Sequence, residues 1–214
     1  MSRDLSDLRQ EYDYEGLDEE SVDPDPLVQF DVWFKAAVEA GMELANAVVL
    51  ATVSTSGKPA ARYVLLKEYG QDGFVFYTHA DSAKGRHMRE HPQVALLFYW
   101  GPMHRQVRIE GAVETLPAGK ADEYFQSRPR GSQLSAWAAV QSSVVENREE
   151  LEEHVREMGE KIGDGSVPRP ESWLGYRVIP ESMEFWQGRE NRLHDRLLFT
   201  RDAKGGWRLQ RLAP

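Results

Sequence analysis

The chain has 214 residues, a length that suits one domain or two small ones. Of these residues 41% are hydrophobic and 29% charged, which is typical of a soluble globular protein. It contains no cysteine, which excludes disulfides, thiolate metal ligands and cysteine nucleophiles and fits a reducing cytoplasm. No apolar run is long enough to span a bilayer, and the first residues lack the apolar core of a secretory signal, so a cytoplasmic location is expected.

The formal net charge of −9 is concentrated at the N-terminus. Residues 1–26 contain ten acidic and two basic residues, which leaves the rest of the chain nearly neutral. Because no broad basic face remains, nucleic acid is not expected as the main partner. The acidic, apolar-poor start predicts a mobile arm over residues 1–24, followed by a single domain over residues 25–214.

A helix is predicted as the first regular element, within residues 23–41. Asp25 can cap it, Pro26 can occupy its first position, and Gly41 suits the position just beyond its end. Its apolar residues recur at helical spacing around Phe30, so this side of the helix should be buried.

A β-meander is predicted over residues 47–80, because apolar β-branched runs are separated there by the turn sequences STSGKP (54–59) and YGQDG (69–73). The next segments are predicted as a short helix within 82–92, strands over 93–100 and 105–116, and a helix within 117–129.

The last third of the chain returns to strands after a charged helix. Residues 146–163 carry a thin apolar stripe among many charges, which is typical of a surface helix. Four strands are then predicted over 174–180, 183–188, 193–201 and 207–212. Roughly eight strands with interspersed helices indicate a mainly β fold, a closed or split antiparallel β-barrel with helices packed outside.

The stretch EFWQGRENRLHDRLLF, residues 184–199, gathers cationic and titratable side chains around one apparent turn. If its second half is an extended strand, Arg192, His194 and Arg196 share one face, close to Trp186 across the turn. Such a face could hold an anion or an aromatic ring. A solvated edge strand with a charged outer face explains the same pattern equally well.

A second candidate site lies in residues 124–137. Tyr124 and Arg128 are neighbours at i and i+4 on a predicted helix, and Ser132 follows shortly after. A phenol, a guanidinium and a serine hydroxyl at a helix end could bind a phosphate. An ordinary helix C-terminus followed by a turn is the simpler interpretation and is slightly favoured from the pattern alone.

Other cationic positions give weaker signals. Arg62 and Lys67 bracket an apolar run, but their spacing places them on opposite faces of a regular strand. Lys84 lies at a predicted helix start, where backbone N–H groups favour anions, and Gln141 and Ser142 offer polar donors. The histidines lack a metal-binding spacing and no nucleotide-binding glycine motif occurs, so no metal site is predicted.

Seven segments taken together resemble the pyridoxine (pyridoxamine) 5′-phosphate oxidase family. They are RYVLLK, FYT, RQVRIEG, YFQSRPRGSQLSAWAAVQSS, FWQG, RLHDR and the terminal RLAP. The resemblance extends from about residue 8 to Pro214. It implies a split β-barrel that forms a homodimer with FMN at the subunit interface. It also implies oxidation of pyridoxine 5′-phosphate and pyridoxamine 5′-phosphate to pyridoxal 5′-phosphate, with O2 as acceptor and H2O2 (and ammonia from the amine) as products.

The resemblance further implies a role for each matching residue. In the FMN site, Arg62, Lys84, Gln141 and Ser142 would hold the phosphate and ribityl chain, Tyr63, Val64, Leu65, Leu66, Lys67, Tyr77, Thr78 and Gln106 would line the isoalloxazine, and Trp186 and Arg196 would come from the partner subunit. In the substrate site, Lys67, Tyr124, Arg128 and Ser132 would bind the phosphate, the catalytic residues Arg192 and His194 would lie over the pyridine ring, and Arg9 and Tyr12 would belong to a segment that closes over it.

The chain departs from the family at one position of the FMN site. The family often has Arg-Lys where this chain has Ala83-Lys84, so one cation at the FMN phosphate is missing. Unless Arg86 or His79 compensates, the loss of one charge-assisted hydrogen bond predicts FMN binding that is weaker by about tenfold to a hundredfold.

Two other functions stay open at this point. One is a flavin- or deazaflavin-binding split-barrel reductase that acts on another substrate. The other is a non-catalytic binder of pyridoxal phosphate on the same fold. The substrate-side segments RLHDR and SRPRGS argue against the first of these.

Overall fold

The computed structural model describes residues 16–214 and divides into two compact units. Unit 1 comprises the chain up to Val49, Ala95–Glu110 and Pro180–Pro214. Unit 2 comprises Leu50–Val94 and Gly111–Ile179. Each unit therefore collects segments that are far apart in the sequence. The arm over residues 1–24 and the single domain that follows it stay a prediction.

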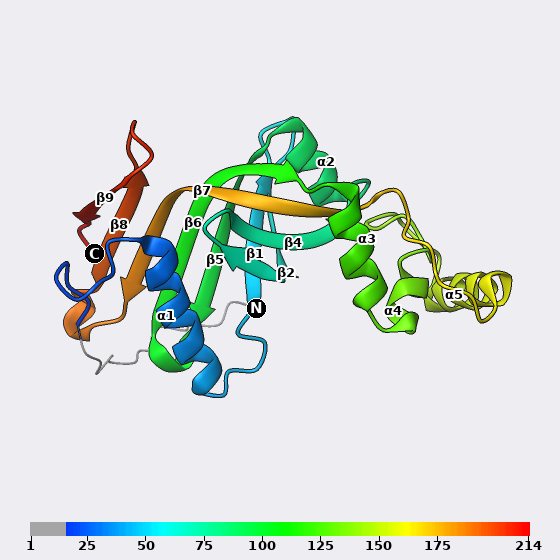
Figure 1. Ribbon diagram of the computed structural model, residues 1–214, viewed down its shortest axis with the longest axis horizontal. Helices are drawn as coiled ribbons and strands as arrows, with labels where there is room; N and C mark the ends of the chain where they lie inside the picture. The colour runs from blue at the N-terminus through cyan, green and yellow to red at the C-terminus, as the bar shows by residue number, and fades with distance from the viewer. Residues whose placement is uncertain (1–15) are drawn as a thin grey trace, which may run out of the picture. The chain divides into compact units, whose positions relative to one another are not determined.

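The helices and strands follow the predicted order up to the last strands, except that the sequence did not predict helix α4 (Figure 1). The helices are α1 (Pro26–Glu39), α2 (Ala83–Glu90), α3 (Ala118–Ser127), α4 (Arg130–Ser135) and α5 (Arg148–Ile162), with short 3₁₀ turns η1 (Gly101–Met103) and η2 (Glu190–Arg192). The strands are β1 (Ala47–Val53), β2 (Pro59–Leu65), β3 (Glu68–Gly70), β4 (Gly73–His79), β5 (Gln93–Trp100), β6 (Arg105–Thr115), β7 (Trp173–Gln187), β8 (Asp195–Arg201) and β9 (Trp207–Arg211). No helix within residues 16–214 has both the length and the apolar character needed to cross a membrane.

The strands of the described chain form one sheet in the order β2-β1-β5-β6-β7-β4-β3, with β8 paired to β7 and β9 paired to β8. Strands β1, β5, β6 and β7 contribute residues to both units. Strand β7 pairs antiparallel with β4, with Val178 opposite Phe74, and then with β8, with Ser182 opposite Thr200. The antiparallel sheet is of the kind that the sequence predicts.

Helix α1 packs against aromatic residues in unit 1. Its start is as predicted, because Oδ1 of Asp25 accepts a hydrogen bond from the backbone N–H of Leu27 at 2.9 Å. Its end is also as predicted, because Gly41 follows the helix with a φ of 72°. The ring of Phe30 is fully buried and lies 5.1 Å from the ring of Phe98, so the apolar face of α1 forms part of the core.

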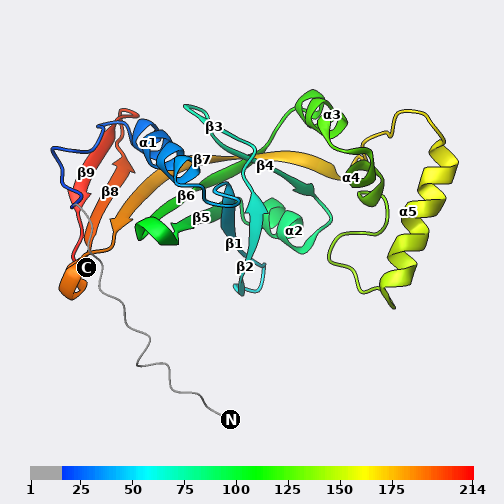
Figure 2. The ribbon, with the colours of Figure 1, turned by 90° about the horizontal axis from the view of Figure 1, so that it is seen from below.

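Unit 2 contains the helices α2, α3, α4 and α5. The buried side chains of α3 include Phe125, which packs on Trp173 at the start of β7. Helix α5 is capped by Asn147 and has no fully buried residue, so it is the surface helix that the sequence predicts. Figure 2 shows α5 at the edge of unit 2, next to α4.

Two sequence predictions about the last strands are wrong. The strands predicted over 174–180 and 183–188 are one continuous strand, β7. Pro180 lies between the residues of β7 that pair with β4 and those that pair with β8, so its missing N–H interrupts neither ladder.

The predicted strand over 193–201 begins at Asp195 instead. Asn191 and Arg192 adopt left-handed backbone conformations, with φ of 53° and 61°, in the turn η2. Arg192 and His194 therefore precede the strand, and the argument that Arg192, His194 and Arg196 share one strand face fails. The turn chemistry of Glu190 and Asn191 overrides the strand periodicity, because the N–H of Leu193 bonds to the Glu190 carbonyl at 3.1 Å.

Candidate functional site

Two half-buried cations of unit 2 lie close to one another at the start of α2 and on β2. The ammonium of Lys84 donates to Oε1 of Gln141 at 2.8 Å and to the hydroxyl of Thr78 at 3.1 Å. The guanidinium of Arg62 donates through Nη1 to the Leu50 carbonyl at 2.9 Å and to Oγ1 of Thr52 at 2.8 Å. All of these acceptors are neutral, so they orient the two cations without neutralising them.

The electrostatics of this pair favour an anion. Burial, and then the charge of Arg62, lowers the pKa of Lys84 to about 8, and burial also lowers the pKa of Arg62. No carboxylate of residues 16–214 forms an ion pair with either cation. A phosphate at this place would offset the two positive charges and so favour the charged forms that burial disfavours.

The backbone at the start of α2 lies close to the residues that precede it and to Ser142. The hydroxyl of Ser82 caps the helix by accepting from the N–H of Gly85 at 3.1 Å, and the N–H of Ala83 bonds to Oγ of Ser142 at 3.3 Å. A Cβ at Gly85 would lie 2.5 Å from the His79 carbonyl, so this position requires glycine. The segment Gln141–Ser142, a weak signal in the sequence, thus belongs to the cation site.

The structure shows the contacts of Arg86 and His79, the two residues that could replace the cation missing at Ala83. The guanidinium of Arg86 folds onto the backbone carbonyl of Asp81. The ring of His79 lies against Ser172, with 3.3 Å between its Nδ1 and the hydroxyl. Burial, followed by the charges of Lys84 and Arg128, lowers the pKa of His79. The imidazole is therefore neutral near pH 7 and adds no positive charge.

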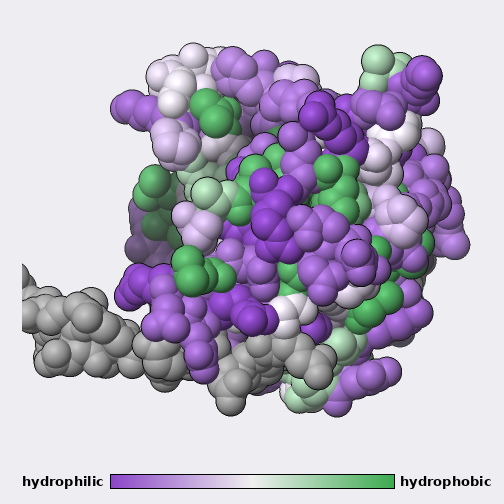
Figure 3. Space-filling view, turned by 90° about the vertical axis from the view of Figure 1, so that its left-hand side faces the viewer, coloured by the Kyte–Doolittle hydropathy of each residue, from purple (hydrophilic) through white to green (hydrophobic). Residues whose placement is uncertain are grey.

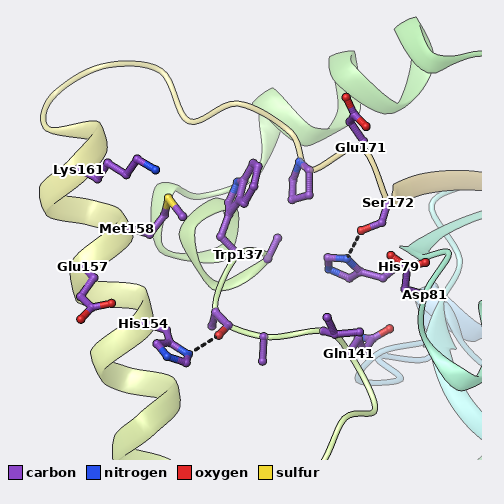
Figure 4. Close-up of a pocket in the computed structure, with 15 residues that line it drawn as sticks. His79, Asp81, Trp137, Gln141, His154, Glu157, Met158, Lys161, Glu171 and Ser172 are labelled. Atoms are coloured by element: carbon purple, nitrogen blue, oxygen red, sulfur yellow. Dashed lines mark hydrogen bonds between the residues drawn. The ribbon is translucent and has the colours of Figure 1, made fainter.

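A cavity of about 880 Å³ in unit 2 begins at the same residues. It lies between α5 and residues 136–141, and Gln141 and His79 line the end next to the cation site (Figure 4). At the other end, Nδ1 of His154 lies 2.8 Å from the Ala138 carbonyl. Gln141 is thus held between the open cavity and Lys84.

Three aromatic rings form a second group in unit 2. The ring of Tyr77 stacks on Tyr124 at 4.3 Å and on Trp173 at 5.2 Å between centroids. The guanidinium of Arg128 lies 5.0 Å from the centre of the Trp173 ring, and the ammonium of Lys67 lies 5.9 Å from that of Tyr124. The structure therefore brings together three of the four predicted phosphate-binding residues.

Arg128 is the member of this group with an unused donor. Its Nη1 atom is buried, and no hydrogen-bond partner for it exists among the described residues. Burial lowers the pKa of the guanidinium, which still stays charged near neutral pH. A buried charged donor without a partner is costly, so the geometry favours an incoming oxyanion. The fourth predicted residue, Ser132, lies in α4, where its backbone carbonyl accepts from Oγ of Ser135 at 3.1 Å.

The predicted ring-lining segment of β2 is open. The side chains of this strand alternate between exposed and half-buried, and Tyr63 is 72% exposed. Leu65 and Lys67 are exposed as well, whereas Leu66 is buried. This edge strand therefore offers surface to a flat ligand or to another chain.

In unit 1, Trp186 and Arg196 lie directly opposite each other across β7 and β8. The guanidinium of Arg196 donates through Nε to Oε1 of Glu184 at 2.7 Å and through Nη1 to the Ala213 carbonyl at 2.9 Å. Nη2 of Arg108 donates to the other carboxylate oxygen of Glu184 at 2.6 Å. The pair predicted for the flavin site is thus adjacent and held in place, and Gln106 is half-buried on the neighbouring strand β6 of the same unit.

Glu184 is a residue that the sequence interpretation missed. Burial opposes its ionisation, but the hydrogen bonds from Arg196 and Arg108 outweigh burial, and the pKa of Glu184 is lowered. It is therefore an ionised carboxylate that is only 6% exposed. An acidic residue inside the apolar run MEFW was the available signal for it.

His194 contacts Trp186, with 4.7 Å between ring centroids. Its Nδ1 accepts the backbone N–H of Arg189 at 3.1 Å, which leaves the proton of the neutral ring on Nε2. Burial and the charge of Arg192 lower the pKa of His194, while Asp195 opposes them. Arg192 is exposed in the turn before it. Arg9 and Tyr12, the other predicted substrate residues, lie outside the described residues.

Comparison with known proteins identifies the family. A family model described as pyridoxamine 5′-phosphate oxidase matches residues 34–162, and a model described as the pyridoxine 5′-phosphate oxidase C-terminal dimerisation region matches residues 173–214. Curated proteins named pyridoxine/pyridoxamine 5′-phosphate oxidase are 53% identical in Rubrobacter xylanophilus and 51% identical in Burkholderia mallei. The first match covers 99% of this chain and 97% of its relative, and the second covers 98% and 99%.

Solved structures agree on the fold. PhzG from Burkholderia lata, in complex with tetrahydrophenazine-1-carboxylic acid, matches with a TM-score of 0.88 at 28% identity, over 96% of this chain and 100% of that one. A pyridoxamine 5′-phosphate oxidase-related, FMN-binding protein from Nostoc punctiforme matches with a TM-score of 0.72 at 16% identity, over 90% and 100%. The predicted fold class, a split antiparallel β-barrel with helices, is confirmed.

The lowered pKa of Lys84 predicts a pH dependence for the binding of a phosphate ligand such as FMN. Below about pH 8 the ammonium is charged, and above it each pH unit removes about nine-tenths of the charged form, so the Kd should rise roughly tenfold between pH 7 and pH 9. Fluorescence titration of FMN at several pH values measures this. In the variant Lys84→Arg the charge persists, so its Kd should stay level over the same range, and an equal rise in both proteins would contradict the assignment to Lys84.

Proposed function

The chain belongs to the pyridoxine/pyridoxamine 5′-phosphate oxidase family, and we propose that it is an FMN-dependent oxidase that converts pyridoxine 5′-phosphate and pyridoxamine 5′-phosphate to pyridoxal 5′-phosphate. In this reaction O2 is the electron acceptor and H2O2 is formed, with ammonia released from the amine. The observation that carries the proposal is the presence of two separate cationic groups in unit 2, Arg62 with Lys84 and Lys67 with Arg128. The reaction needs two phosphorylated aromatic ligands, and each group suits one of them.

The first group fits the phosphate of FMN. Arg62 and Lys84 are half-buried cations without a carboxylate partner among the described residues, and Gln141 and Ser142 add polar atoms beside them. The exposed residues Tyr63 and Leu65 of β2 would lie along the ring system. Ala83 leaves a methyl group where the family often has a guanidinium, and Arg86 is held by the Asp81 carbonyl. We therefore expect the phosphate to depend on Arg62 and Lys84.

The second group fits the phosphate of the substrate. Arg128 supplies a buried Nη1 donor in need of an acceptor, and Lys67 supplies a second positive charge beside Tyr124. The stack of Tyr77, Tyr124 and Trp173 holds these cations over flat rings, which limits their motion before binding. The phosphate does not react, so its binding fixes one end of the substrate and orients the carbon that is oxidised.

FMN, held by Arg62, Lys84, Gln141 and Ser142, would supply the redox chemistry, a two-electron oxidation of the C4′ carbon with O2 as the final electron acceptor. The protein supplies orientation and charge. The N–H of Arg189 donates to Nδ1 of His194 and so fixes the orientation of the imidazole, with the proton of the neutral ring on Nε2. Arg192, exposed in the adjoining turn, adds a positive charge that would stabilise the oxygen substituent of the pyridine ring.

The same assignment places the FMN at an interface between two copies of the chain. Residues 173–214, which match a dimerisation region, contain Trp186, Arg192, His194 and Arg196. Glu184 fixes the orientation of Arg196 in advance, so the pair Trp186 and Arg196 is arranged before it meets a ligand. We propose that these residues complete the flavin site of the partner subunit.

One observation favours a second candidate function. The Burkholderia lata structure with a TM-score of 0.88 holds tetrahydrophenazine-1-carboxylic acid, a reduced aromatic acid without a phosphate. A flavin-dependent oxidase or reductase acting on such a ring would bind the flavin phosphate and the carboxylate of the substrate, so the two cationic groups of unit 2 suit either candidate. The curated relatives at 53% and 51% identity support the phosphorylated substrate.

A substrate comparison tests the proposal. The purified protein, loaded with FMN, should consume O2 and form pyridoxal 5′-phosphate and H2O2 in equal amounts from pyridoxine 5′-phosphate or pyridoxamine 5′-phosphate. Unphosphorylated pyridoxine should react poorly at the same concentration, because it lacks the phosphate that Lys67 and Arg128 would bind. Faster turnover of a tetrahydrophenazine carboxylic acid than of either phosphate ester would favour the second candidate instead.

Substitution of Arg128 and Arg192 should separate binding from turnover. Loss of one charge-assisted hydrogen bond in Arg128→Ala should raise KM by about tenfold to a hundredfold. Arg192→Ala should chiefly lower kcat, with FMN content unchanged. Steady-state kinetics and the flavin absorbance of each variant measure both effects. Arg156→Ala, which removes an equal charge from the exposed face of α5, serves as the control and should change neither constant. An unchanged KM in Arg128→Ala would remove Arg128 from the substrate phosphate site.

A further inference from the structure

A buried glutamine lies at the base of the turn between β7 and β8. Residues 188–194 connect the two strands and include Arg192 and His194, so we call them the ring turn. Gln187, the last residue of β7, precedes the ring turn and is only 1% exposed. It pairs with Asp195 at the last step of the β7–β8 ladder. The ladder does not continue into the ring turn, so other contacts must fix where the turn leaves β7.

The side-chain amide of Gln187 joins the ring turn to the connection between β5 and β6. Its Nε2 donates to the carbonyl of Met103 at 3.1 Å and to that of His104 at 3.3 Å, and its Oε1 accepts from Nε of Arg105 at 2.9 Å. The N–H of Gly188 also donates to the His104 carbonyl, at 2.8 Å. Figure 1 shows the β5–β6 and β7–β8 connections at the same end of these strands. Because the amide nitrogen faces two acceptors and the amide oxygen faces a donor, the orientation of the amide is fixed.

Arg105, the donor to Gln187, is held in turn by the core of unit 1. Its guanidinium lies 4.5 Å from the centre of the Trp33 ring on α1. The Trp33 ring is 3% exposed and packs edge-on against Phe185, with 5.2 Å between centroids. Phe185 lies in β7, two residues before Gln187. The partner of the Gln187 amide is therefore fixed by buried aromatic rings on both α1 and β7.

The backbone is strained in both connections. Five described residues other than glycine have a positive φ, and three of them are His104, Asn191 and Arg192, with φ of 47°, 53° and 61°. This conformation is unfavourable for residues with a Cβ and persists only where surrounding contacts enforce it. The strained His104 is one of the two residues whose carbonyls accept from Gln187. Strain on both sides of one buried amide indicates that the position of the ring turn matters for function.

Apolar packing does not hold the outer part of the ring turn. Residues 190–193 are exposed, and the side chain of Leu193 is 70% exposed. Figure 3 views the side of unit 1 that carries β8 and β9, where hydrophilic side chains predominate and apolar ones are scattered among them. The ring of His194 lies on Trp186, the residue before Gln187. The placement of the ring turn thus depends on its base at the end of β7.

We propose that Gln187 is a positioning residue for the oxidation. Through its amide it sets where the ring turn leaves β7, and therefore where Arg192 and His194 lie relative to the pyridine ring of the substrate. A displacement of reacting groups by about 1 Å can lower a rate by on the order of a hundredfold, so a contact outside the site can control turnover. This inference rests on the proposed function and assigns a role to a residue outside the FMN and substrate sites.

Steady-state kinetics of the full-length, FMN-loaded protein test this role. Gln187→Met has a similar length and volume but makes none of the three side-chain hydrogen bonds, so it should lower kcat for pyridoxine 5′-phosphate by roughly tenfold. KM and FMN content should stay within about twofold, because the cations proposed for both phosphates lie in unit 2.

Gln29→Met is the matched control. Gln29 is another buried glutamine of unit 1, 5% exposed, and its Oε1 accepts the N–H of Asp23 at 3.0 Å. Its substitution removes a buried hydrogen bond without touching the ring turn, so kcat should stay unchanged.

A double-mutant cycle with His194→Ala shows whether Gln187 acts through the ring turn. Gln187→Met should lower kcat much less in the His194→Ala background than in the wild type, because one of the groups that it positions is then absent.

Amide hydrogen exchange follows the ring turn without substrate or turnover. In Gln187→Met the amide of Gly188 should exchange at least about tenfold faster than in the wild type, whereas the amides of residues 183–185 in β7 should keep their rates. Gln187→Glu is the second variant. It keeps an acceptor for Arg105 but turns an oxygen toward the two carbonyls, so it should also speed exchange at Gly188 and lower kcat, even if the methionine variant folds poorly.

The proposal is overturned by unchanged kcat in both Gln187 variants, by effects of Gln187→Met and His194→Ala on kcat that multiply, or by unchanged exchange at Gly188. A loss of FMN in step with kcat would make Gln187 a structural residue and would overturn it as well. A wild-type protein that oxidises neither phosphate ester refutes the proposed function itself, whereas an active wild type with unaffected Gln187 variants refutes only the role of Gln187.

Discussion

The arrangement of unit 2 depends on cations that are partly buried and left without a carboxylate partner. Arg62 and Lys84 are held by neutral oxygens, and burial together with their mutual repulsion lowers the pKa of Lys84 to about 8. Arg128 lies on Trp173 with one buried nitrogen unbonded among the described residues. Each arrangement costs stability in the ligand-free chain, and a bound phosphate would offset that cost. We therefore propose that the empty site is destabilised and that anion binding compensates for this.

In unit 1, in contrast, the guanidinium groups of Arg196 and Arg211 are paired with carboxylates. Arg196 is paired with the ionised Glu184, and Arg211 is paired with Glu19 and Asp195, so both guanidinium groups are neutralised and oriented. A neutralised guanidinium makes a poor phosphate clamp, but it holds a neighbouring ring or peptide in a defined place. Arg196 thereby fixes the surroundings of Trp186, and Arg211, which donates to the Leu17 carbonyl, fixes Leu17. The division between binding cations and positioning cations follows from whether an acid lies within reach.

The sequence predicts much of this and misses a definable part. Capping residues and turn sequences correctly place α1, the strands up to β6 and the surface helix α5, because local chemistry determines those elements. Strand alternation fails at Arg192, where two left-handed residues form a turn that periodicity does not register. The contacts of Glu184 with Arg108 and of Leu17 with Asp195 are missed because the partners are distant in the chain, 76 and 178 residues apart. The stack of Tyr77 on Trp173 is missed for the same reason, since only the pairing of β4 with β7 brings these residues together.

The proposed oxidase activity requires that the chain binds FMN and uses it to oxidise a phosphorylated pyridine. The visible spectrum of the FMN-loaded protein under anaerobic conditions tests this most directly. Addition of pyridoxamine 5′-phosphate should bleach the flavin absorption, and air should restore it with release of pyridoxal 5′-phosphate. A protein that takes up no FMN, or a flavin spectrum that pyridoxamine 5′-phosphate leaves unchanged, would contradict the account.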